Sequence, residues 1–180
     1  MILKLNSLVH FTSLSPTIEQ VNIFVLNLDP DLAARDHCDK HVVKMCLEAT
    51  QMLCAAHPPG DAPWKRTHYN HPCTVWTRSS VENYKWLSKH ALSLFEEYTR
   101  RYGRRHKAHG AAAWCAENIP KNLPVIPMTP FAIAIKDKQY HLGDPVSSYR
   151  AYYIGDKARF ARWRFSKAPD WWVTSQTSTA

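Results

Sequence analysis

The sequence predicts a mainly α fold, a compact single domain of helices with little or no strand. Its 180 residues, 45% hydrophobic and 21% charged, are typical of one ordinary globular domain. Good helix formers fill residues 37–56, and apolar side chains recur at helical spacing within 79–103. Prolines and glycines gather between such stretches and mark connectors. No internal repeat is visible, so we expect one helical domain over residues 21–180.

The first 20 residues look unlike the rest, and we predict a poorly ordered N-terminal extension over 1–20. They lack the cationic start, long apolar centre and cleavage site of a signal peptide. A valine can occupy a non-standard start site, which makes Val21 the natural beginning of the domain. From Asn22, the run NIFVLNLD predicts a short extended segment that ends in a turn at Asp29-Pro30.

The first helical segments follow this turn. Residues 31–36 predict one or two helical turns. Residues 37–56 contain many good helix formers, with Asp39 as a possible N-cap, and predict the central helix. The proline and glycine content of residues 57–72 predicts a loop.

A second long helix is predicted from Ser79 to Gly103. Ser79 and Glu82 have the spacing of a capping box, and a glycine is a common residue just after a helix end. A shorter helix is expected over about 107–117, and the four prolines within 119–130 predict a connector.

The C-terminal part gives weaker signals. The run FAIAI from Phe131 is ambiguous between a strand and a buried turn. Asp144 and Pro145 have the N-cap and first-turn preferences of a last helix, which Gly155 is expected to interrupt.

A narrow polar stripe runs along the predicted central helix. With about 3.6 residues per turn, its five side chains fall within roughly 80° of one another. The other faces are apolar, so we expect a mostly buried helix whose stripe faces a cleft or buried partners. One interpretation is an active-site wall, and the other is an internal ion pair between i,i+4 neighbours. The stripe consists of His37, His41, Lys44, Glu48 and Gln51.

The charge of the chain indicates a polyanionic partner. A net charge of +8, a pI near 9.3, seven Trp and eight Tyr favour nucleic acid over a merely basic protein. Two cation clusters could neutralise phosphates, or could instead favour a helix C-terminus and cover the core. They are Arg100, Arg101, Arg104, Arg105 and Lys107, and Lys157, Arg159, Arg162, Arg164 and Lys167 with Phe160 and Trp163 between them.

Several other classes of site are disfavoured. Five cysteines without CxxC spacing argue against a disulfide framework or a zinc ribbon, and predict reduced thiols in the cytoplasm. His37 and His41 have the spacing of a helical zinc site, but Cys38 stands where HExxH has glutamate. With only five glycines, no P-loop or dinucleotide motif is present. We therefore expect no metal, no cofactor and no membrane span.

The motif His41-x-x-Lys44-x-x-x-Glu48-x-x-Gln51 follows the short apolar segment that begins at Asn22. In this order and spacing it resembles the pyrimidine-dimer DNA glycosylases and AP lyases of phage and bacteria. The resemblance is best from 21 to about 103 and also includes His71, Pro72, Trp76, Glu96, Glu97 and Tyr98.

The resemblance implies a compact helical enzyme, here a monomer, that acts on double-stranded DNA. Its implied chemistry is attack on the sugar of the damaged nucleotide by the α-amine of the enzyme, assisted by a glutamate. Glu48 is then the catalytic candidate, with Lys44 and His41 beside it to hold a phosphate or protonate the leaving base. His37, on the same stripe, is also a catalytic candidate. The candidate substrate-binding residues are Gln51, Lys40, His71, Trp76, Arg159, Arg162 and Lys157.

One departure from the family leaves the lyase step open. The family's amine belongs to a small residue exposed by methionine removal, but here Ile2 follows Met1, and Asn22 follows Val21. A hydrolytic glycosylase remains open, as do two alternatives. These are a phage-type base-modification enzyme on the same scaffold and a non-catalytic nucleic-acid-binding module.

Overall fold

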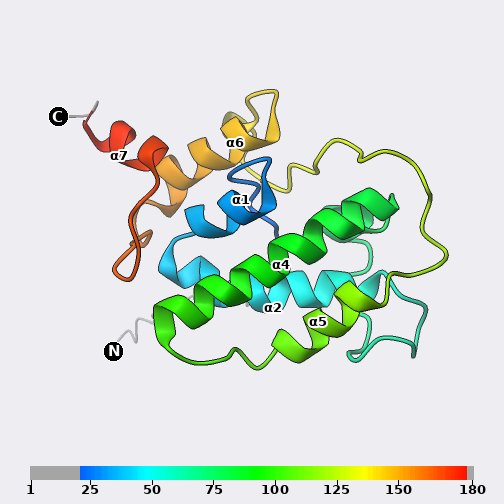
Figure 1. The fold of residues 1–180 in the computed structure, drawn as a ribbon. Coiled ribbons are helices and arrows are strands. Elements are labelled where there is room, and N and C mark those ends of the chain that lie inside the picture. Colours follow the sequence, from blue (N-terminus) through cyan, green and yellow to red (C-terminus); the bar gives the residue numbers. More distant parts are fainter. Residues whose placement is uncertain (1–20, 178–180) are drawn as a thin grey trace, which may run out of the picture.

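Two long helices, α2 (Asp39–Ala55) and α4 (Val81–Tyr102), form the centre of the structure (Figure 1). The structure is a computed structural model and describes residues 21–177. Short α1 (Pro30–Asp36) packs on α4, and α5 (His109–Glu117) packs on both long helices. No strand occurs within 21–177, which confirms the mainly α prediction. The other helices are α3 (Pro72–Thr77), α6 (Pro145–Tyr152) and α7 (Asp170–Thr177), with a 3₁₀ turn at Lys138–Tyr140 and a π-helical turn at Tyr153–Lys157. The predicted extension, residues 1–20, lies outside the described part of the chain.

The N-caps of the two long helices each lie one residue from the predicted N-caps, Asp39 and Ser79. The hydroxyl of Ser80, not that of Ser79, caps α4 by accepting from the Asn83 N–H at 3.0 Å. Gly103 ends this helix as predicted, with a φ of 65°. The N-cap of α2 is Cys38, because Asp39 is already the first helical residue and its carboxylate bonds elsewhere. The sequence signals therefore located both helices but misassigned both N-caps by one residue.

Two short helices, α3 and α7, were not predicted. α3 begins at Pro72, where the predicted loop 57–72 ends, and His71 caps it. The run 131–135 forms no strand and is instead a partly buried irregular segment. At Gly155 the helix α6 has given way to the π-helical turn, and a Cβ there would clash with the hydroxyl group of Tyr140.

The segment 21–26 passes through the core without being a strand, and all six of its residues are buried. The side-chain oxygen of Asn22 accepts from the N–H groups of Ile23 and Phe24, at 2.8 and 3.1 Å. Phe24 has a positive φ of 51°, a conformation that costs a non-glycine residue on the order of 1–3 kcal/mol. Packing of its ring 4.4 Å from that of His41 holds the strained turn beside α2.

All five cysteines are buried free thiols, as expected for reduced core residues. No helix within 21–177 combines the length and the apolar character needed to cross a bilayer.

Candidate active site on the central helix

Glu48, in the middle of α2, is the centre of the candidate site. Its side chain is 6% exposed, and two groups within residues 21–177 hold its carboxylate. The backbone N–H of Asn22 donates to Oε2 at 2.8 Å, and Lys44 Nζ lies 3.3 Å from Oε1. The Lys44 side chain is 35% exposed, so it joins the shielded carboxylate to the surface. Acid and cation therefore converge at this point of the predicted stripe.

His41, one turn before Lys44 on the helix, is an uncharged member of the site. Its Nδ1 is hydrogen-bonded to the Tyr153 hydroxyl. Burial, and then the charges of Lys157 and Lys44, lower the pKa of His41 to about 3. The imidazole is therefore neutral at neutral pH, which leaves Lys44 as the cation beside Glu48.

His37 lies in the core below His41. Its Nδ1–H donates to the Ala33 carbonyl at 2.6 Å, and its ring centroid lies 6.3 Å from that of His41 and 5.4 Å from that of His90. Burial, and then the neighbouring His90 and His41, hold its pKa well below the usual value. His37 is 0% exposed, so it packs behind His41 and cannot contact a substrate.

Three predicted substrate-binding residues come together on the surface next to His41. Lys40, Arg159 and Arg162 line a cavity of about 320 Å³ with Phe160, and we call this group the Lys40 pocket. Lys40 Nζ lies 5.3 Å from the centroid of the Phe160 ring, which itself lies 5.4 Å from that of His41. A cationic, aromatic surface of this kind suits a nucleic-acid backbone.

The remaining predicted residues have mainly local contacts. Lys157 donates to the Tyr152 hydroxyl at 2.9 Å and pairs with Asp156 at 2.7 Å. Gln51 is half-buried, nearly one turn beyond Glu48. Two others support the fold, since His71 accepts from the Cys73 N–H and the buried Trp76 donates its indole N–H to the Thr129 carbonyl.

A family model matches the part of the chain that contains Glu48. Residues 21–109 match the model described as pyrimidine dimer DNA glycosylase. Over these residues the chain is similar to that family. The match contains Asn22, Lys44 and Glu48, and it confirms the resemblance predicted from the motif. No curated protein and no solved structure matches the chain. A match to a DNA glycosylase family implies, in general, glycosylase activity on DNA.

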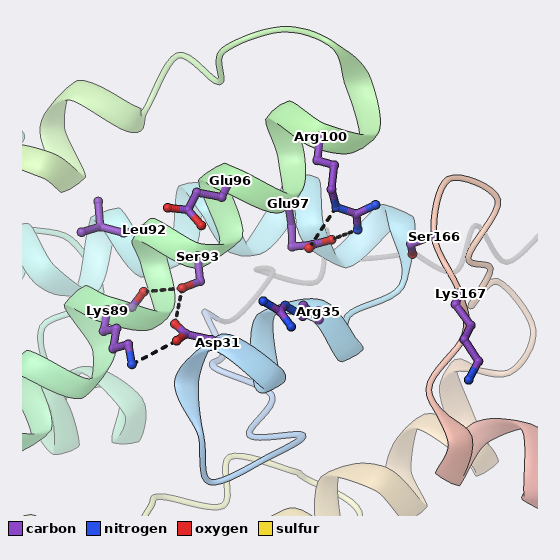
Figure 2. Close-up of a pocket in the computed structure, with 10 residues that line it drawn as sticks. All are labelled: Asp31, Arg35, Lys89, Leu92, Ser93, Glu96, Glu97, Arg100, Ser166 and Lys167. Atoms are coloured by element: carbon purple, nitrogen blue, oxygen red, sulfur yellow. Dashed lines mark hydrogen bonds and ion pairs between the residues drawn. The ribbon is translucent and has the colours of Figure 1, made fainter.

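A cavity of about 870 Å³ lies away from Glu48, between α1 and α4, and Figure 2 shows its lining. Asp31 pairs with Lys89 at 3.0 Å and accepts from the Ser93 hydroxyl at 2.6 Å, while Glu97 pairs with Arg100. These acids and bases neutralise one another, and none of them belongs to the predicted stripe. This cavity therefore contains no residue of the candidate site at Glu48.

The exposed side of α2 differs from the prediction. The apolar residues Val43 and Leu47 were expected to be buried, but they are 39% and 43% exposed. With Trp64 and the segment 104–108 they line a cavity of about 750 Å³ that Lys44 also borders. Sequence reasoning missed these residues, because apolar periodicity does not show which apolar face stays open.

The first predicted cation cluster is divided in the structure. The Arg101 side chain is fully buried, while Arg104 and Arg105 are exposed. Arg101 contacts the carboxylates of Asp39 and Glu97, at 3.2 and 3.0 Å, so it is removed from the predicted phosphate-binding group. Its role is structural.

Proposed function

We propose that this protein is a DNA glycosylase that removes a damaged or modified pyrimidine from double-stranded DNA, with Glu48 as its catalytic carboxylate. The observation that carries the proposal is the buried Glu48 carboxylate, held by Asn22 and Lys44 within the region that matches the family model.

The chemistry follows from the charge that develops during the reaction. Breaking an N-glycosidic bond builds positive charge on the sugar, and a carboxylate beside C1′ stabilises it. Glu48 is shielded from water, which strengthens this interaction. Lys44 is placed to hold the adjacent phosphate or to protonate the leaving base. In the hydrolytic reaction, water adds to C1′ and the base leaves with a proton.

A lyase step requires an amine nucleophile, and the backbone nitrogen of Asn22 lies 2.8 Å from the Glu48 carboxylate. While Val21 is joined to it, this nitrogen belongs to a peptide bond and is not nucleophilic. A lyase step through this atom would therefore require a chain that begins at Asn22. Borohydride trapping of a covalent protein–DNA adduct, with the N-terminus determined by mass spectrometry, separates a lyase from a hydrolytic glycosylase.

The proposal is tested by measuring base release and strand incision on a panel of duplexes, each with one modified pyrimidine. We expect release of at least one modified base and none from the matched unmodified duplex. If the protein binds the duplexes but releases no base from any of them, the proposal is wrong and a non-catalytic DNA-binding module is favoured. Conversion of a base without its release would favour a base-modification enzyme.

The Lys40 pocket gives a prediction for DNA binding. We expect Arg159→Ala combined with Arg162→Ala to reduce the slope of log affinity against log salt by about two, since each phosphate contact contributes about 0.9. Fluorescence anisotropy with a labelled duplex at several salt concentrations measures this slope. The control, Lys136→Ala with Lys138→Ala, removes the same charge from an exposed segment that does not line the pocket. Equal effects of both pairs would mean that only net charge matters.

A further inference from the structure

Cys54 and Cys115 form a pair of thiols in the core between α2 and α5. Cys54 lies in the last turn of α2 and Cys115 in the last turn of α5, and these two helices pack against each other. The sulfur atoms lie 3.6 Å apart, within hydrogen-bonding distance, although 61 positions separate the two residues in the chain. Because the S–S bond of a disulfide is about 2.05 Å long, the two sulfur atoms need to approach by only about 1.5 Å to form one.

The backbone of Cys115 is fixed by a buried chain of hydrogen bonds. The hydroxyl of Tyr84, on α4, donates to the Cys115 carbonyl at 2.9 Å. The oxygen of the same hydroxyl is hydrogen-bonded to His57 Nε2 at 2.8 Å. Both Tyr84 and His57 are buried, so this chain is shielded from water. It holds α5 in place beside the end of α2 and keeps the two sulfur atoms together.

The contact between the two thiols distinguishes Cys54 from the other cysteines. The hydrogen bond from the Cys115 thiol stabilises the Cys54 thiolate, which lowers the pKa of Cys54 and raises that of Cys115. Burial raises the pKa of the other three thiols, to about 12 for Cys46 and Cys73. The thiolate is the form of cysteine that reacts with peroxides. Cys54 is therefore the most readily oxidised thiol, and a second thiol already lies beside it.

We propose that Cys54 and Cys115 form a redox-sensitive modification site, which hydrogen peroxide converts to a disulfide between α2 and α5. The Cys54 sulfur attacks one peroxide oxygen, the O–O bond breaks and water leaves, so that Cys54 becomes a sulfenic acid. The Cys115 sulfur then attacks the Cys54 sulfur, the S–S bond forms, and the hydroxyl group leaves with the Cys115 proton as a second water. The two thiols thereby lose two electrons, and one peroxide is reduced to two waters.

Hydrogen peroxide, a molecule little larger than water, reaches Cys54 by local opening of the segment 57–71. Cys54 is 2% exposed, and the backbone of Trp64 in this segment hydrogen-bonds to its thiol. Residues 58–61, which follow the end of α2, are all exposed, and exposed loops open at a low cost in free energy. The resulting disulfide closes the chain between α2 and α5 and stabilises the folded protein.

The test treats the full-length protein with hydrogen peroxide, removes the oxidant, and counts thiols by alkylating the unfolded chain. We expect five thiols before treatment and three after it, and a peptide map should contain one linked pair, Cys54 with Cys115. Dithiothreitol should restore all five thiols. The melting temperature of the oxidised protein should rise by about 5 °C or more, the scale for a disulfide that closes a long loop.

Cys54→Ala and Cys115→Ala should each abolish the linked peptide and the rise in melting temperature. Cys46→Ala is the matched control, because Cys46 is another fully buried thiol of α2, and this variant should keep both results. If a variant of the pair does not fold, the thiol count and the peptide map of the unsubstituted protein still decide. Five intact thiols after treatment, a different pairing, or a sulfinic acid at Cys54 without a linked peptide would overturn the proposal.

Discussion

Replacing Glu48 with glutamine should lower the single-turnover rate of base release by on the order of a hundredfold or more, the scale for losing a catalytic charge or acid–base group. The glutamine keeps the shape of the side chain, and its carbonyl oxygen can still accept from the Asn22 N–H. What is lost is the negative charge beside C1′. DNA affinity should stay the same or increase, because the substituted side chain no longer repels phosphates. Single-turnover kinetics and anisotropy on one preparation measure both effects.

A structural role for Glu48 predicts a different result. If the carboxylate only neutralised Lys44, the substitution would lower the free energy of unfolding and leave turnover per folded molecule intact. The Lys44 side chain is 35% exposed, so water can solvate its charge, and we expect a stability cost of about 1 kcal/mol or less. Glu117→Gln on the exposed end of α5 is the control for a loss of one carboxylate. Full turnover with a depressed melting temperature would remove Glu48 from the active site.

The long helices could be predicted because their signals are local. The apolar periodicity of α4 and the stop at Gly103 need no knowledge of the rest of the chain. The short helices depend on distant contacts. α7, for example, is anchored by the indole N–H of Trp171, which donates to the Asp36 carboxylate at 2.8 Å. A contact that joins residues so far apart in the chain leaves no pattern within a sequence window.

In the candidate site, too, the contact between near neighbours in the chain could be predicted, and the contact between distant residues could not. Lys44 and Glu48 are i,i+4 neighbours on a helix, so their spacing alone predicted the observed pair. The bond from the Asn22 N–H to Glu48 crosses 26 positions and depends on the buried path of residues 21–26. Only the family resemblance suggested that the start of the domain lies near this glutamate. The neutral state of His41 also required the structure, because it follows from burial beside two lysines.

Arg101, which the sequence placed among phosphate-binding cations, instead joins three helices. Its fully buried guanidinium donates from Nε to Glu97 at 3.0 Å and from Nη1 to the Asp39 carboxylate at 3.2 Å. Nη1 and Nη2 also donate to the backbone carbonyls of His37 and Arg35, at 2.8 and 3.0 Å. The side chain therefore ties the end of α4 to the C-terminal end of α1 and the beginning of α2, the helix that carries the candidate site.

Arg101→Met should lower the free energy of unfolding by about 3–5 kcal/mol, the scale for removing one member of a buried ionic group. Methionine fills much of the space but leaves the buried carboxylates of Asp39 and Glu97 without this partner, together with two backbone carbonyls. Urea unfolding followed by circular dichroism measures the change. Arg100→Met is the matched control, because Arg100 also pairs with Glu97 but is 54% exposed, so it should cost no more than about 1 kcal/mol. Equal losses for the two variants would show that the buried network contributes no more than a surface ion pair.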